Sequence, residues 1–410
     1  MNISSLLSAI FVCGCFNYAA ASNAILSNAN ASSTILFVGD IGGTNTRLAL
    51  YEPGSKSPIF KGEYLNSQFL VKKNNTFEKE IFDPFLTASN ISFEEKNIIA
   101  CFAVAGPVKD NCGVMTNLGQ KKSVFKNDAF SMTLNGDSIE DSVVGNLKYI
   151  KKCKIINDFV GQGYGLLDLD YDKEVVELIP GSKDMIDPTG PKACLGAGTG
   201  LGECYLTTSS FHPEEGYECY PSEGGHADYT PRSDLEVDLL NYLKGKFGES
   251  SRISVERVVS GKGLANVYDF LAKKFPDKVS EALHRKFEIA ADMQGRVVGM
   301  SANSKSTEDA CPLCVKAMEI MMSAYGSEAG NCAVKFIPSG GLFVSGGLTP
   351  KNMAFIAGEN SPFMKAYKDK GRMSPLIESI PLFAVTVEDL GEYELSYLIS
   401  FHHSYSYRMH

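Results

Sequence analysis

The stretch DIGGTNTRLAL, residues 40–50, decides how this chain folds. Apolar runs at 35–38 and 48–51 enclose its polar part, so the pattern predicts two strands joined by a tight turn. Glycines let such a turn approach a phosphate and expose its N–H groups, while the arginine adds a fixed positive fork. The first carboxylate could face Mg²⁺ through water. The candidate cofactor-binding residues are Asp40, Gly42, Gly43, Thr44, Asn45 and Arg47, and the alternative is a plain hairpin turn.

A second glycine-rich turn, GAGTGLG at 196–202, lies between apolar runs. It lacks both the GxGxxG spacing of a dinucleotide site and the Lys-Ser/Thr ending of a Walker A loop. A turn of this kind suits a second phosphate contact, centred on Gly198, Thr199 and Gly200.

The segment 340–350 carries paired glycines on both sides of a short apolar run. A planar adenine or ribose could lie beside Gly346 and Gly347. A bulged strand between loops explains this segment equally well.

An Asn-Asp pair, Asn157 and Asp158, ends the expected strand 154–156, whose last two residues are isoleucines. Catalytic groups in α/β folds tend to follow strands in this way. The Asp158 carboxylate could accept a hydroxyl proton, as the loop aspartate of protein kinases does. The competing interpretation is a helix N-cap, a position that Asp often occupies.

Glu223-Gly224-Gly225-His226 and, further along, Glu256 supply polar groups of the kind that a sugar site needs. Sugar hydroxyls are small and directional, so several carboxylates and amides must converge on them. The alternative for the histidine is an ordinary hydrogen-bonded surface or core residue.

Strand-like and helix-like segments alternate along the chain, which favours an α/β or mixed α+β fold. Further strands are expected at 98–104 and 204–206. Ser233 to Glu236 has the form of a capping box, and apolar residues at helical spacing follow it up to Phe247. A second apolar stripe, 264–275, predicts another helix.

The composition excludes some functions. The 410 residues carry a formal net charge of −9 without long single-sign runs, which disfavours nucleic-acid binding. The 11 cysteines are an odd number, and Cys101, Cys153 and Cys194 lie in apolar runs, which indicates buried reduced thiols rather than a disulfide scaffold. The pair Cys311 and Cys314 has no second ligand pair at zinc spacing, so no structural metal is predicted.

The N-terminus has the features of a targeting segment. An apolar stretch, 6–16, precedes small residues at 19–22 and an Asn/Ser/Ala-rich linker at 23–33. The stretch resembles a signal-peptide core and is too short to span a bilayer, and no other segment could span one.

The motifs of this chain resemble, in the same order, those of the bacterial-type glucokinase family, from about residue 35 to 370. They are DIGGTNTRLAL, IINDF, LGAGTGLG, EGGH, SVERVVSG and GGLFVSGGLTP. The resemblance implies a two-domain α/β sugar kinase of the ribonuclease-H-like, actin-like ATPase superfold, with an interdomain cleft. It implies ATP-dependent phosphorylation of glucose to glucose 6-phosphate, the first step of glycolysis, with Mg²⁺.

The resemblance also implies residue roles. Asp158 matches the general base, and the glucose-binding positions match Asn157, Glu223, His226, Glu256 and, in a retained Thr-Asn pair, Asn117. The two glycine turns match the phosphate loops, and Gly346 and Gly347 match the nucleoside side.

The expected domains are a segment 1–33, a small domain of 34–165 completed by 385–410, and a large domain of 166–384. The expected partners are glucose and ATP, with no nucleic acid and no membrane, and a homodimer is compatible with the sequence. A cytoplasmic location is expected because the reaction needs ATP, and an ATP-containing organelle is the alternative.

Three other functions stay open. A kinase of the related repressor and sugar-kinase family would act on another hexose or an N-acetyl sugar, but its clustered cysteine motif is missing after His226. A non-catalytic sugar sensor would not need Asp158 or the phosphate turns. An ATPase or chaperone of the same superfold would leave the Glu–His–Glu set idle.

Overall fold

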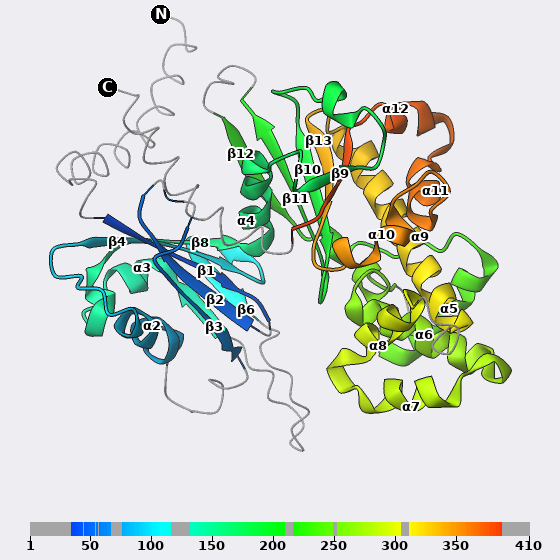
Figure 1. Cartoon of the computed structure of the whole chain (residues 1–410), viewed down its shortest axis with the longest axis horizontal. Coiled ribbons are helices and arrows are strands. Elements are labelled where there is room, and N and C mark those ends of the chain that lie inside the picture. Colours follow the sequence, from blue (N-terminus) through cyan, green and yellow to red (C-terminus); the bar gives the residue numbers. More distant parts are fainter. Residues whose placement is uncertain are drawn as a thin grey trace, which may run out of the picture. The chain divides into compact units, whose positions relative to one another are not determined.

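The computed structural model describes residues 34–387 except 44, 54, 56, 67–75, 116–131, 210–215, 249–251 and 305–310. The described chain divides into two compact units, one ending at Gly161 and the other beginning at Gln162 (Figure 1). This boundary lies inside helix α4 (Asp158–Gly165). The N-terminal segment 1–33 and residues 388–410, which include most of the expected second part of the small domain, lie outside the described residues.

The first unit is built on a five-stranded sheet in the order β3-β2-β1-β4-β8. Strands β1, β4 and β8 are parallel, whereas β2 is antiparallel to β1 and to β3. The carboxyl ends of the three parallel strands therefore meet at one edge, where Ile41, Val104 and Asn157 are in register. The strands are β1 (Thr34–Ile41), β2 (Asn45–Tyr51), β3 (Phe60–Leu65), β4 (Asn97–Val104) and β8 (Ile150–Asn157).

Aromatic rings fill the core of this unit. Phe37 of β1 stacks on Phe85 of helix α2 with ring centroids 5.4 Å apart, and Phe82 stacks on Phe102 of β4 at 4.3 Å. These pairs fix α2 on the sheet, because large buried rings contribute most to packing energy. The other elements are a π-helical turn η4 (Glu78–Phe82), α2 (Asp83–Ala88), β5 (Val108–Lys109), β6 (Cys112–Met115), β7 (Met132–Asn135), α3 (Gly136–Glu140) and η5 (Gly145–Tyr149).

The second unit has a six-stranded sheet in the order β12-β11-β10-β13-β14-β9. Strands β10, β13 and β14 are parallel at its centre, and β11, β12 and β9 are antiparallel to their neighbours. The strands are β9 (Val175–Glu177), β10 (Lys192–Ala197), β11 (Leu201–Thr208), β12 (Tyr217–Ser222), β13 (Gly341–Ser345) and β14 (Leu382–Val385).

Helices cover this sheet, and the long α9 (Pro312–Phe336) is central among them. It contacts β10 and β13 and packs along α6, α8 and α11. Its Tyr325 is fully buried, and the hydroxyl accepts the N–H of Ala197 at 3.1 Å and reaches the Ser345 carbonyl at 3.1 Å. The other helices are α5 (Asp234–Phe247), α6 (Gly261–Lys274), α7 (Glu281–Ile289), α8 (Gln294–Ala302), α10 (Met353–Ile356), α11 (Pro362–Lys368) and α12 (Ser374–Glu378).

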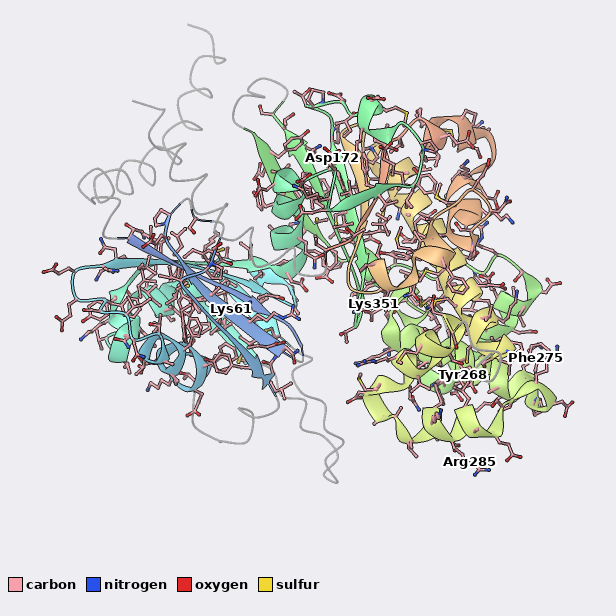
Figure 2. The ribbon with its side chains drawn as sticks, viewed as in Figure 1. Lys61, Asp172, Tyr268, Phe275, Arg285 and Lys351 are labelled. Atoms are coloured by element: carbon pink, nitrogen blue, oxygen red, sulfur yellow. The ribbon has the colours of Figure 1, made fainter. Side chains whose placement is uncertain are left out.

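Local signals in the sequence explain where these helices begin. The Ser233 side chain accepts the N–H of Glu236 and caps α5, as the capping-box pattern predicts, and Ser260 caps α6 through Gly263. Tyr268 of α6 is buried, whereas Arg285 of α7 is largely exposed (Figure 2).

The described cysteines are all free thiols, and every one except Cys112 is buried. The prediction of buried reduced thiols at Cys101, Cys153 and Cys194 is therefore confirmed. Among the helices of the described residues, none is long and apolar enough to cross a membrane.

Candidate functional site

In the first unit, the predicted phosphate turn joins β1 to β2 at the carboxyl edge of the sheet. The N–H of Gly42 donates to the carbonyl of Asn45 at 3.0 Å and closes the turn. The side chain of Asn66, directly after β3, binds the turn on both sides: it accepts from Thr46 Oγ1 at 2.7 Å and donates to the Gly42 carbonyl at 2.7 Å. The turn is therefore held in one shape before any ligand arrives.

Charged groups flank this turn. Arg47 pairs with Asp40 across β1 and β2, with Nη1 3.8 Å from Asp40 Oδ2, and its Nε lies 3.5 Å from Glu63 Oε1. Glu63 Oε1 also accepts from Asn45 Nδ2 at 3.0 Å. About a third of the Asp40 and Arg47 side chains is exposed, at 32% and 36%, so both groups can still meet a solvent-borne ligand.

The Asn157–Asp158 pair stands at the same edge, where β8 ends and α4 begins. Asn157 Oδ1 accepts the N–H groups of Phe159 at 2.9 Å and Val160 at 3.3 Å, and its Nδ2 donates to the Gly106 carbonyl at 3.1 Å. Asn157 is therefore the N-cap of α4. Asp158 is the first helical residue, and its Oδ1 shares the N–H of Phe159 at 3.0 Å.

In the second unit, the predicted phosphate turn joins β10 to β11. The N–H of Gly198 donates to the Gly200 carbonyl at 2.8 Å, and the Gly198 carbonyl accepts from Gly261 at the start of α6 at 2.9 Å. These bonds place the tip of the turn, with Thr199 at its centre, beside the N-terminus of α6.

The paired glycines Gly346 and Gly347 follow β13, the parallel neighbour of β10. Leu348 N–H donates to the Ala197 carbonyl at 3.1 Å. Gly346 has φ +82°, and a Cβ there would lie 2.6 Å from the Ala197 oxygen. Only glycine fits this conformation and this approach. The structure thus brings the segments at Gly198 and Gly346 together at one sheet edge.

The predicted sugar residues Glu223, His226 and Glu256 form one cluster in the second unit. The short 3₁₀ turns η9 (Gly224–His226) and η10 (Val255–Arg257) are joined by the bond from Val255 N–H to the Ala227 carbonyl at 2.8 Å. His226 Nε2 lies 3.8 Å from Glu223 Oε2, and Nδ1 lies 3.7 Å from Glu256 Oε1. The imidazole is 58% exposed, so the cluster is open to a ligand rather than part of the core.

The sugar cluster and the glycine turn of this unit are adjacent. A Cβ built on Gly200 would lie 3.0 Å from Glu256 Oε2, and Ser260 Oγ holds the Glu256 carbonyl at 2.7 Å just before α6. Groups suited to hydroxyls thus lie next to backbone suited to phosphate, which is the arrangement that a sugar kinase requires.

Comparison with known proteins agrees with this chemistry. Residues 37–395 match the family model described as glucokinase. A glucokinase from Synechocystis sp. (strain ATCC 27184 / PCC 6803 / Kazusa) is 38% identical over 368 residues, which cover 86% of this chain and 94% of that protein. The chain belongs to the glucokinase family.

Solved structures show the glucokinase fold as well. The chain resembles the glucokinase of Balamuthia mandrillaris in complex with glucose, with a TM-score of 0.71, 21% identity, and coverage of 94% of this chain and 99% of that one. A glucokinase from an Antarctic psychrotroph gives a TM-score of 0.62 at 23% identity, covering 90% and 98%. The predicted α/β fold of the actin-like ATPase class is confirmed.

Two predicted residues of the glucokinase site, Thr44 and Asn117, lie outside the described residues. Sequence reasoning also missed two residues that the structure adds. Glu63 and Asn66 reach the first phosphate turn from β3 and its end. Glu63 faces Arg47 in the antiparallel register, and an alternating surface strand such as β3 gives no signal of that contact.

A substitution at Gly346 tests its close approach to the Ala197 carbonyl in this glucokinase-family fold. Gly346→Ala should destabilise the protein by about 2 kcal/mol or more, because it strains a positive φ and crowds backbone atoms that cannot move away. Gly245→Ala in α5 is the matched control, since a Cβ there meets nothing within 4 Å and alanine favours a helix. Urea unfolding of both variants measures the difference, and equal midpoints would contradict the close approach.

Proposed function

We propose that this chain transfers the γ-phosphate of ATP to the 6-hydroxyl of glucose. The observation that carries the proposal is the closeness of the Glu256 carboxylate to Gly200 of the second glycine turn, together with His226, which lies near both Glu256 and Glu223. Membership of the glucokinase family supports the same reaction.

In the proposed mechanism, Asp158 accepts the proton of the 6-hydroxyl. The transfer is late, because the transition state of phosphoryl transfer is loose and leaves the protein mainly to position and to neutralise charge. Asn157 fixes the start of α4 by its cap, which holds the Asp158 backbone in place. Its second Nδ2 hydrogen can donate to a sugar hydroxyl.

The remaining residues have binding roles in the proposal. Glu223, His226, Glu256 and Asn117 bind glucose hydroxyls. The N–H groups of the two glycine turns, with Asn45 and Arg47, bind the phosphates of ATP. Gly346 and Gly347 leave room for the nucleoside, since neither carries a side chain.

The residues of the first turn fit Mg²⁺. This ion keeps several waters and is held by one or two carboxylates together with substrate phosphates. Asp40 offers a partly exposed carboxylate at the edge of the turn. When bound, Mg²⁺ would neutralise charge on the phosphates. Asp40 would orient the ion through water.

The location, the domain bounds and the oligomeric state are further parts of the proposal. We place the protein in the cytoplasm, because ATP is available there, with an ATP-containing organelle as the alternative. We retain the domain bounds 34–165 with 385–410, and 166–384. A homodimer is retained as a proposal too.

A coupled assay of ADP release tests the function. The full chain should release ADP with glucose and Mg²⁺, and much less with fructose or with N-acetylglucosamine and N-acetylmannosamine. Chelation should abolish the activity and Mg²⁺ alone should restore it. Glucose binding without ADP release would favour the sensor, and a preference for an N-acetyl sugar would favour the repressor and sugar-kinase family.

A further inference from the structure

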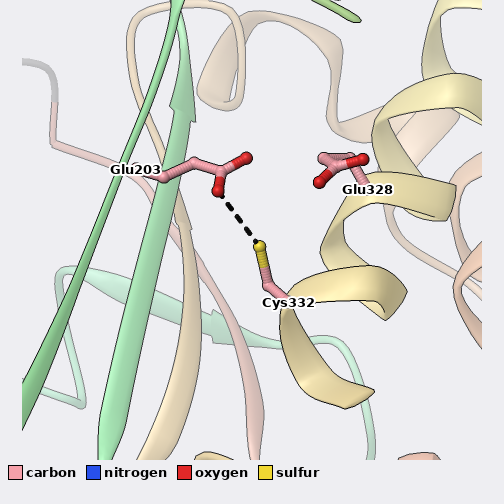
Figure 3. A group of neighbouring side chains, drawn as sticks. All are labelled: Glu203, Glu328 and Cys332. Carbon is pink, nitrogen blue, oxygen red and sulfur yellow. Dashed lines mark hydrogen bonds between the residues drawn. The ribbon is translucent and has the colours of Figure 1, made fainter. Parts of the chain in front are cut away.

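A buried group of three side chains lies apart from the residues assigned above. Glu203 projects from β11 toward α9, where Glu328 and Cys332 are one helical turn apart (Figure 3). One ligand atom from each residue lies within 4.8 Å of the other two. Cys332 Sγ is 3.5 Å from Glu203 Oε2.

The charges of this group are poorly satisfied by the protein. The exposed fractions of Glu203, Glu328 and Cys332 are 3%, 4% and 2%. Among the described residues, the Oε1 atoms of both glutamates are buried and have no hydrogen-bond partner. Glu328 Oε2 accepts from Asn331, and Lys335 Nζ stays 3.8 Å from Glu328 Oε1 on a side chain that is 55% exposed.

A second cation, Lys370, also lies near this group, but its Nζ donates to Asn331 Oδ1 at 2.9 Å. Neither lysine hydrogen-bonds the Oε1 atoms of the two glutamates, so the group lacks a cation of its own. A buried carboxylate that lacks a partner destabilises a fold by several kcal/mol, and two of them facing each other repel. The thiol is a weak donor and cannot replace a cation.

We propose that Glu203, Glu328 and Cys332 bind one divalent cation of the zinc type, with water as a fourth ligand. A thiolate with two carboxylates suits zinc better than Mg²⁺ or Ca²⁺, which prefer oxygen alone. Ligand atoms around tetrahedral zinc lie about 3.3–3.7 Å apart, given bonds of about 2.3 Å to sulfur and about 2.0–2.2 Å to oxygen. The Cys332–Glu203 separation of 3.5 Å already matches. On binding, the thiol proton passes to solvent.

The cation would have a structural task. Its ligands come from β11 and α9, so it links the sheet to its central helix. Glu203 Oε2 also lies against Gly224 in the turn that carries His226, so close that a Cβ on Gly224 would overlap it. The site thereby supports the backbone of the sugar cluster without touching a substrate. The prediction of no structural metal rested on Cys311 and Cys314, neither of which takes part here.

Cobalt titration of the metal-stripped full chain tests the proposal. Co²⁺ should bind one equivalent, give the ligand-field bands of a tetrahedral site and a thiolate-to-cobalt charge-transfer band, and be displaced by Zn²⁺. Zn²⁺ should raise the thermal midpoint. Absence of the charge-transfer band would overturn the proposal.

Three variants locate the site. Cys332→Ser should abolish the charge-transfer band, and Glu203→Gln, which keeps its volume, should weaken Co²⁺ binding at least tenfold. The control replaces both Cys311 and Cys314 by Ser, which keeps a capping oxygen where the Cys311 sulfur now caps α9. It should retain the band. A band that survives in Cys332→Ser, or that disappears in the control, would refute the site. Near-ultraviolet circular dichroism verifies that each variant folds. If Cys332→Ser does not fold, the Co²⁺ affinity of Glu203→Gln tests the site, and an unchanged affinity would refute it.

Discussion

Asp158→Asn should lower kcat by at least about 100-fold and leave the thermal midpoint near that of the wild type. The change removes the proton acceptor, and general-base catalysis is typically worth about 10²- to 10⁴-fold. The amide keeps the size of the side chain and can still contact a hydroxyl, so glucose affinity should change much less. Stability should hold because Asn157 caps α4, and an asparagine at 158 keeps a side-chain oxygen that can accept the Phe159 N–H.

Two further variants separate catalysis from capping. Asn157→Ala removes the cap and should cost about 0.5–2 kcal/mol of stability. Asp141→Asn, at an exposed position of the same unit, should change neither kcat nor the midpoint. Measuring kcat and thermal unfolding for all three is sufficient. If Asp158→Asn keeps its kcat, Asp158 is not the base and the proposed mechanism is wrong.

Glu256→Gln should reduce kcat/KM for glucose by roughly ten- to hundredfold. Hydrogen bonds to charged groups are worth about 1.5–3 kcal/mol, and the neutral amide loses most of that with a hydroxyl donor. KM for ATP should stay nearly unchanged, because the Gly198–Gly200 turn is held by backbone bonds to itself and to Gly261 rather than by the carboxylate.

The control for this variant is Glu359→Gln, whose side chain is 85% exposed. Initial-rate kinetics with each substrate varied in turn give both KM values. Equal losses for glucose and ATP would mean that Glu256 maintains the fold of the turn instead of binding the sugar.

The sequence predicted those features that depend on neighbours along the chain. The strands around residues 40–50, the cap at Ser233 and the glycine turns are local patterns, and the structure has them where they were expected. The Asn-Asp pair was recognised as well, and the structure divides the N–H groups at the helix start between the two: Asn157 accepts two of them and Asp158 shares one. Helix-start geometry decides which of two adjacent side chains meets the free N–H groups, and residue types alone do not give it.

Contacts between segments that are distant along the chain could not be predicted from the sequence. Glu203 precedes Glu328 and Cys332 by more than a hundred residues, and only the packing of α9 on the sheet joins them. Glu63 was missed for the same reason, because its partner Arg47 is set by strand register. Without several related sequences, no pattern in one chain reports such pairs.

The buried Tyr325 hydroxyl couples two segments of the chain that are far apart in sequence. It bonds to the strand ends from which both glycine segments depart, at Ala197 and at Ser345. Loss of the hydroxyl would remove a partner from the buried Ala197 N–H, while the Ser345 carbonyl would retain its bond from Thr349 Oγ1. One side chain therefore acts on two segments that lie about 150 residues apart in the chain. Substitutions in either glycine segment therefore have to be compatible with the same tyrosine, which restricts the combinations of changes that the fold can tolerate.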